Sequence, residues 1–234
     1  MKKVGLFFCW VFMFLMGCEH SGLNRGWRFL QRKNYVQAIS SLTTYISNTK
    51  TGDKNVGRMA SAFFYRGLSQ QMIGHYAEAE EDYQKTLQLI PHFYYASFNI
   101  GLIKLRCRCF DESTAWFGKT WGIICNIECG QHEYFSWFDD ELLMKDASLC
   151  YSYYLMGLLH QRRFSEVRKL VSGLPDWLMI TDEETRILTE KIINSEEDWN
   201  VLVDISVNWI NKDKNNLCGF SNWMKAQLLN MAGE

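Results

Sequence analysis

The chain has 234 residues, of which 47% are hydrophobic and 22% are charged, and its formal net charge is −1. This composition is that of a folded protein with one elongated domain, or one domain plus an appendage. Removing Lys2 and Lys3 with a cleaved leader would make the net charge −3. The chain therefore lacks the excess of positive charge that is typical of nucleic-acid-binding proteins.

The amino terminus has the pattern of an export signal. Lys2 and Lys3 precede an apolar run from Val4 to Met16, which is shorter than the roughly 20 residues that a membrane-spanning helix needs. The sequence Leu15-Met16-Gly17-Cys18 then resembles the lipobox of bacterial lipoproteins, in which the cysteine carries the lipid. The resemblance implies a signal peptide over residues 1–17, palmitate on Cys18, and a periplasm-facing anchor in the cell envelope, with the outer membrane favoured. The alternative is an ordinary secretory signal and an unlipidated periplasmic binding protein.

A first helix is expected to begin by about Gly22. Arg25, Arg28 and Arg32 would share one face of it, opposite the apolar residues Leu23, Trp27 and Leu30. From a lipid on Cys18, three extended residues reach only about 10 Å, so these arginines would lie near anionic head groups. The alternative is an ordinary solvated helix face.

Residues 60–93 contain two amphipathic helices, a tight turn and a proline stop. Apolar and small residues follow helical spacing in the first half, at Phe63, Phe64, Gly67 and Leu68. Gly74 interrupts the pattern, and Pro91 ends the second helix. The side chains that the second helix turns toward the first are Ala79, Tyr83, Leu87 and Leu89. This segment resembles the tetratricopeptide repeat, whose small-residue, aromatic and terminal-proline signature it matches along the full unit.

The same spacing occurs on both sides of this hairpin. Gly101 lies 34 residues after Gly67, whereas Gly26 lies 41 residues before it. An aromatic residue follows each glycine nine residues later: Tyr35 after Gly26, Tyr76 after Gly67 and Phe110 after Gly101. Three units are the number at which stacked repeats usually become stable. We therefore predict three hairpins over residues 18–123, in an all-α, right-handed α-solenoid.

The resemblance also implies a partner-binding groove. In this family the first helices of stacked hairpins line a concave face that commonly receives an extended peptide or a partner helix. The positions that carry over to this chain are Phe64, Leu68, Gln71, Tyr95, Phe98, Asn99, Leu102 and Arg106. Such a surface suits an apolar anchor with a few amide contacts. The alternative is that Phe64, Leu68 and Phe98 pack between hairpins or beneath a carboxy-terminal helix.

The repeat pattern weakens after residue 123. Residues 124–147 predict a crossover with a short helix beginning near Asp139, whose carboxylate suits a helix amino end. Residues 148–175 resemble a degenerate fourth hairpin, which Gly173 and Pro175 end.

Residues 176–234 predict three capping helices, which would cover the open end of the stack. Two reciprocal capping pairs mark helix starts, Thr181 with Glu184 and Ser195 with Asp198. The alternation at residues 201–207 also fits a strand, but the preceding cap and the spacing of Trp199 and Trp209 favour a helix. A last helix is expected from Ser221 to Met231.

No catalytic motif is complete. Gly118-Lys119-Thr120 lies in a predicted helix rather than after a strand, so it does not fit a nucleotide-binding loop. His132-Glu133 lacks the second histidine of a zinc protease, and no serine occupies a glycine-flanked nucleophile turn. We predict a non-catalytic module that needs no cofactor or metal. The alternative is a secreted or membrane-associated enzyme with its activity in residues 124–234.

Six cysteines lie outside the leader, and in an exported protein they would be oxidised by default, with 15 possible connectivities. Cys107 and Cys109 lie in a hairpin turn, whereas Cys125 and Cys129 lie about 24 Å away, beyond the next helix. A single four-cysteine metal site is therefore excluded. The return to the fourth hairpin predicts that Cys125 or Cys129 pairs with Cys150. The alternative is that these cysteines are small buried hydrophobic residues.

Together these features predict a lipid-anchored adaptor or scaffold of the bacterial envelope. Its partner would be a protein, bound as an extended peptide or a helix, and it would assist the assembly of an envelope complex. Contact with a membrane would come through the lipid, and no nucleic acid is expected.

Overall fold

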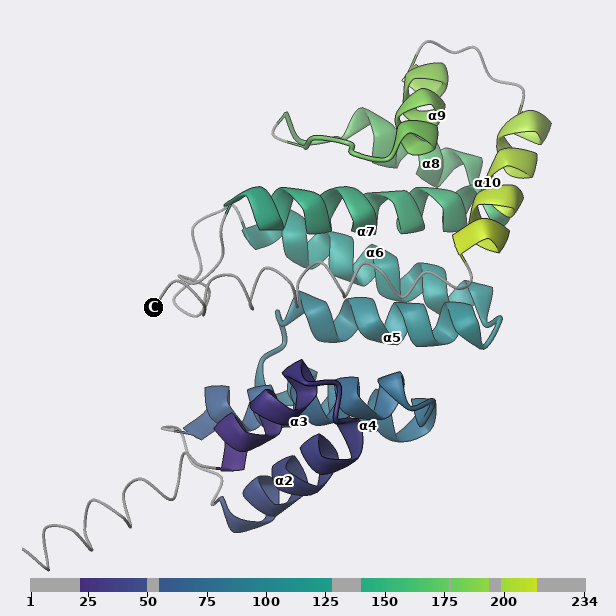
Figure 1. Ribbon diagram of the computed structural model, residues 1–234. Helices are drawn as coiled ribbons and strands as arrows, with labels where there is room; N and C mark the ends of the chain where they lie inside the picture. Colours follow the sequence, from purple (N-terminus) through teal and green to yellow (C-terminus); the bar gives the residue numbers. More distant parts are fainter. Residues whose placement is uncertain (1–21, 50–54, 128–139, 177, 194–198, 214–234) are drawn as a thin grey trace, which may run out of the picture. The chain divides into compact units, whose positions relative to one another are not determined.

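The computed structural model describes residues 22–49, 55–127, 140–176, 178–193 and 199–213. Within these residues all regular secondary structure is helical, in ten helices (Figure 1). This confirms the all-α prediction. The chain divides into two compact units between Ala96 and Ser97.

The first unit consists of consecutive helices that pack on their neighbours in the chain. They are a helix over residues 22–31, α2 (Tyr35–Asn48), α3 (Val56–Met72), α4 (Tyr76–Leu89) and the first turn of α5 (Tyr94–Arg106). Helix α2 packs on α3, and α3 packs on α4. As predicted, Trp27 and Leu30 face the interior, whereas Arg25, Arg28 and Arg32 are exposed.

In the second unit most helices also pack on their neighbours in the chain, but the last described helix packs on an earlier one. The unit contains the rest of α5, α6 (Phe110–Ile127), α7 (Asp140–His160), α8 (Phe164–Ser172), α9 (Glu183–Ile193) and α10 (Trp199–Asp213). Helices α6 to α9 pack in chain order, but α10 returns to pack against α7. The last described helix therefore covers an earlier helix of the unit.

The hairpins share one turn conformation. The residue two positions before α2, α4, α6 and α8 has a left-handed φ angle: 57° at Lys33, 86° at Gly74, 62° at Arg108 and 56° at Arg162. Only glycine adopts this conformation without strain, so the three cations are held there by their surroundings. An aromatic residue begins each of the four following helices. The segment predicted as a degenerate fourth hairpin therefore has the same turn as the other three.

The repeated glycines allow the two helices of a hairpin to approach closely. A Cβ atom on Gly26 would lie 2.4 Å from Leu42 Cγ, and one on Gly101 would lie 2.8 Å from the Phe117 ring. On Gly67 it would lie 3.1 Å from the backbone of the facing helix. In the fourth hairpin the corresponding position, nine residues before the aromatic, is the buried Leu155. That hairpin therefore packs without the glycine contact.

Two local predictions need correction. The short helix expected near Asp139 and the first helix of the fourth hairpin are one continuous helix, α7, because no glycine or proline interrupts residues 140–156. The cap of α9 is Asp182 rather than Thr181. Asp182 Oδ2 accepts hydrogen bonds from the Thr185 backbone N–H (2.8 Å) and hydroxyl (2.6 Å).

Helix α10 confirms the helical interpretation of residues 201–207. The cap predicted at Ser195 and the helix predicted over Ser221–Met231 lie outside the described residues. No helix in the described ranges combines the length and the apolar character needed to cross a bilayer. The signal peptide predicted over residues 1–17 and Cys18 also lie outside those ranges.

Candidate interaction surface

The predicted groove residues are mostly interior. Seven of the eight are buried: Phe64, Leu68 and Asn99 (0% exposed), Gln71 and Tyr95 (4%), and Phe98 and Leu102 (8%). Arg106 is exposed. For Phe64, Leu68 and Phe98 this burial agrees with the packing alternative, and partner binding at the eight positions stays a prediction.

In the first unit, Phe64 lies among aromatic neighbours of its own unit. Its ring centroid is 5.0 Å from that of Phe93, 5.7 Å from Tyr83 and 6.4 Å from Tyr95. The Tyr83 hydroxyl donates to Gln71 Oε1 at 2.6 Å. Burial, together with the nearby Asp82 charge, raises the pKa of Tyr83 well above its usual value. These contacts hold the hairpin together.

In the second unit, Phe98 belongs to a cluster of four aromatic side chains from four helices. Its ring lies 5.4 Å from Phe117 on α6 and 5.7 Å from Tyr153 on α7. Tyr153 stacks on Phe117 at 4.8 Å and meets Trp209 of α10 edge-on at 5.0 Å. A carboxy-terminal helix beside Phe98 agrees with the packing alternative, whereas the contact of Trp209 with Tyr153 was not predicted, because these residues lie far apart in the chain.

An open cleft of about 530 Å³ lies at the turn ends of the third and fourth hairpins, all within the second unit. Its lining is Arg108, Cys109, Phe110, Asp111, Glu112, His160 and Gln161. The volume is that of an ordinary ligand or peptide pocket. Gln161 Nε2 fixes one wall by donating to Thr114 Oγ1 (2.8 Å) and to the Phe110 carbonyl (3.1 Å). Because one cation, Arg108, and two carboxylates, Asp111 and Glu112, line the cleft, it suits a polar segment that carries charges of both signs.

The described cysteines carry free thiols: Cys107, Cys109, Cys125 and Cys150. Cys150 is fully buried and donates its thiol to the Phe117 carbonyl at 3.5 Å. Burial raises the pKa of this thiol well above its usual value, and the nearby Cys125 and Asp146 raise it further. Cys125 and Cys150 are therefore not bonded to each other in the structure, and the pairing of Cys150 with Cys129, which lies outside the described residues, stays a prediction.

In the part of the chain that the structure describes, no group of side chains forms a metal-binding site. No three of its histidine, cysteine, aspartate and glutamate side chains form a group that could hold a metal ion. Cys109 and His160 both line the cleft, but the Cys109 thiol is directed to the Cys107 carbonyl at 3.8 Å, and the His160 ring lies 4.7 Å from Phe110.

Successive helical hairpins with close small-residue contacts and one shared turn conformation define a helical-repeat protein. Residues 60–93, which contain most of α3 and all of α4, match the family model of the tetratricopeptide repeat. Repeats of this family are protein–protein interaction modules. No curated protein sequence matches the chain.

Proposed function

We propose that the protein is a lipid-anchored, non-catalytic adaptor of the bacterial envelope, which binds a protein partner and assists the assembly of an envelope complex. The observation that carries the proposal is the tetratricopeptide repeat over residues 60–93, with the same turn conformation in the hairpins before and after it. The leader and the Leu15-Met16-Gly17-Cys18 sequence support the anchor.

The partner contacts are proposed at exposed positions of the repeats. Arg106 is the exposed member of the predicted groove set, and it lies two residues before Arg108, which lines the cleft. The side chains at the other seven groove positions are buried, so they would support the exposed residues rather than contact the partner directly. An extended peptide with charges of both signs fits the cleft, since Arg108 and Asp111 can each pair with an opposite charge, whereas Glu112 already pairs with Lys104 at 3.0 Å.

Photocrosslinking in living cells tests the partner. A photoreactive residue replaces Arg106 or Glu112 in separate strains, and the control replaces Lys169, which is exposed on α8 outside the cleft. The expected result is one protein captured from both test positions and not from position 169. Purified partner should then bind the full chain and lose affinity when Asp111 is replaced by lysine. Equal capture from all three positions would refute a partner at this surface.

Metabolic palmitate labelling tests the anchor. Label should enter the wild-type protein and be absent from the Cys18→Ser variant. An unlabelled wild-type protein found in the periplasm would instead support the unlipidated alternative.

A further inference from the structure

Charge is segregated within the first unit. Residues 20–52 contain no aspartate or glutamate. The described part of this stretch carries four cations, Arg25, Arg28, Arg32 and Lys33, which give it a formal charge of +4. The described carboxylates of the unit all lie on α4. A protein with a net charge of −1 therefore has one hairpin that is purely cationic.

All four cations are exposed. Arg25, Arg28 and Arg32 follow each other at intervals of three and four residues, so they share one face of the helix over residues 22–31. The opposite face is fixed by packing, because Trp27 and Leu30 are buried and Gly26 lies against Leu42. The arginine face therefore cannot rotate inward without exposing the core of the hairpin.

The turn extends the same surface. Lys33 has a left-handed φ of 57° and is exposed, and it is followed by Val36, an apolar side chain that is 69% exposed. Arg28 Nε donates to the Asn24 carbonyl at 3.3 Å, which keeps this side chain along the helix surface. The surface thus combines four cations with an exposed apolar side chain, which is the combination that binds at the interface of an anionic bilayer.

From these observations we propose that the first hairpin lies on the membrane, with Arg25, Arg28, Arg32 and Lys33 bound to anionic phosphate head groups. The inference rests on the proposed anchor for its geometry. Three residues separate Cys18 from Gly22 and span at most about 10 Å. The ten-residue helix is about 15 Å long, so all three arginines reach within a Debye length of the surface when its axis lies along the membrane.

A bilayer fits this surface better than a soluble polyanion. Four cations on one short hairpin make a small footprint, and the carboxylates of α4 would repel a long nucleic acid that extended beyond it. The apolar run Val4–Met16 precedes this hairpin directly in the sequence, so the cations lie next to the segment that targets the chain to a membrane.

Vesicle flotation tests the proposal with the chain from Glu19 onward, which lacks the leader and the lipid. Every described helix begins at Gly22 or later, so the removed residues belong to none of the described helices. The chain is expected to float with vesicles of phosphatidylcholine and phosphatidylglycerol but not with phosphatidylcholine alone. Binding should be lost when salt shortens the Debye length from about 8 Å to about 3 Å.

The test variant replaces Arg25, Arg28 and Arg32 by glutamine. Each basic residue near an anionic surface strengthens binding roughly fivefold, so the partition coefficient should fall roughly a hundredfold. The control variant removes the same charge elsewhere, through Arg58→Gln, Arg162→Gln and Lys169→Gln, all at exposed positions outside the cleft. It should bind within about twofold of the wild-type chain, and thermal melts should show that both variants are folded.

Three outcomes would overturn the proposal: wild-type chain that does not float, a test variant that binds as tightly as the control, or equally tight binding to soluble polyphosphate, which would assign an anion site without a bilayer. These outcomes are separable from failure of the proposed function. A chain that is palmitoylated and captures a partner but does not float refutes the membrane surface alone. A chain that floats through its arginines but takes up no palmitate refutes the anchor alone.

Discussion

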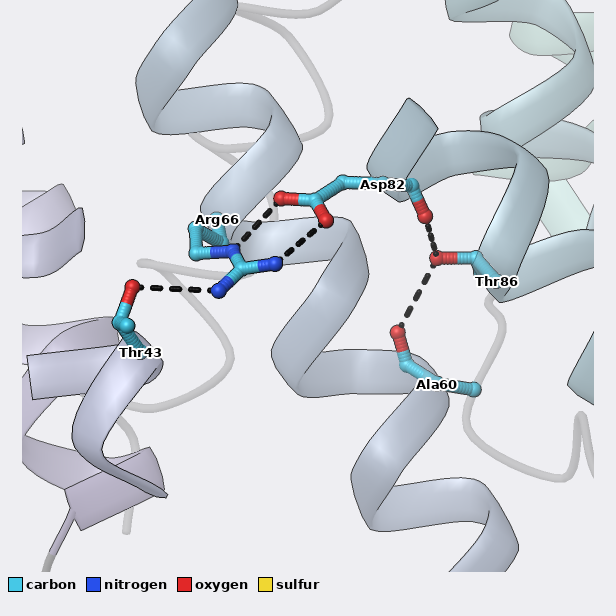
Figure 2. A network of polar contacts seen from close by, with 5 residues as sticks. All are labelled: Thr43, Ala60, Arg66, Asp82 and Thr86. Carbon is cyan, nitrogen blue, oxygen red and sulfur yellow. Dashed lines mark hydrogen bonds and ion pairs between the residues drawn. The ribbon is translucent and has the colours of Figure 1, made fainter. Parts of the chain in front are cut away.

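Arg66 and Asp82 join the two helices of the α3–α4 hairpin through a two-pronged ion pair (Figure 2). Arg66 Nε donates to Asp82 Oδ2 and Nη2 donates to Oδ1, both at 2.7 Å. The third nitrogen, Nη1, donates to Thr43 Oγ1 on α2 at 3.1 Å. One guanidinium therefore holds three helices, and we predict that Arg66→Met destabilises the first unit.

The size of the effect follows from burial. The Asp82 side chain is 3% exposed and that of Arg66 is 15% exposed. Breaking a fully buried pair costs about 3–5 kcal/mol, because the remaining charge loses both water and its partner. Some water already reaches this pair, so we expect Arg66→Met to lower the free energy of unfolding by about 3 kcal/mol. Replacing both residues, as Arg66→Met with Asp82→Leu, should restore stability to within about 1 kcal/mol of wild type.

Urea denaturation combined with hydrogen exchange measures this effect, because exchange resolves the amides of α3 and α4 from those of the second unit. The matched control is Glu112→Gln, which breaks the Lys104–Glu112 pair at 3.0 Å, where the glutamate side chain is 58% exposed. An exposed pair should cost less than about 1 kcal/mol. An Arg66→Met variant no less stable than this control, or a double variant as unstable as the single one, would refute the reasoning.

Three further predictions concern packing and pH. Gly101→Ala should lower the free energy of unfolding by about 1–3 kcal/mol, because its Cβ would lie 2.8 Å from the Phe117 ring. A Cβ on Gly122 of α6 would meet nothing within 4 Å, so Gly122→Ala should raise the free energy of unfolding by up to about 1 kcal/mol. Thermal melts that show equal effects for the two variants would contradict this. Burial raises the pKa of Tyr65 to about 12 from a usual 10.0. Above pH 10 the unfolded chain therefore loses this proton before the folded chain does. The free energy of unfolding should fall as pH rises from about 10 to about 12, by up to about 1.4 kcal/mol per pH unit. Urea titrations between pH 10 and 12 should show a shallower fall for Tyr65→Phe, and an unchanged slope would count against the buried phenol. Trp209→Ala should speed hydrogen exchange across α10 by the equivalent of about 3–5 kcal/mol and leave the first unit unaffected; protection lost in both units would contradict this.

The hairpins could be predicted from the sequence because their determinants are local. Gly67 and Tyr76 lie nine residues apart within one hairpin, and a Cβ atom on Gly67 would lie 3.1 Å from the Ala79 carbonyl oxygen of the facing helix. A spacing of this kind can be recognised without knowing what lies beyond the hairpin. The predicted boundary between a short helix near Asp139 and the first helix of the fourth hairpin was wrong for a related reason. The repeat pattern resumes at Ser148, but nothing in the preceding residues ends the helix that begins at Asp140.

The candidate surface was harder to predict, because burial depends on residues distant in the sequence. The positions of Phe64 and Phe98 carry over from the family, but their exposure depends on the volume of the surrounding side chains. Phe93 and Tyr95 fill the space around Phe64, and Tyr153, on a helix that begins 42 residues after Phe98, packs on that ring. A position in a repeat therefore predicts where a side chain points, but not whether space remains beside it.

The return of α10 limits where a partner can bind in the second unit. Helix α7 is the first helix of the fourth hairpin, and first helices line the face that receives a partner in the family that this chain resembles. Trp209 of α10 packs edge-on against Tyr153 of α7 and completes the aromatic cluster that includes Phe98. A helix of the protein itself thus occupies part of such a surface. A partner helix would have to displace α10, whereas a peptide in the charged cleft at the turn ends would not, because the described residues that line this cleft all lie outside α10.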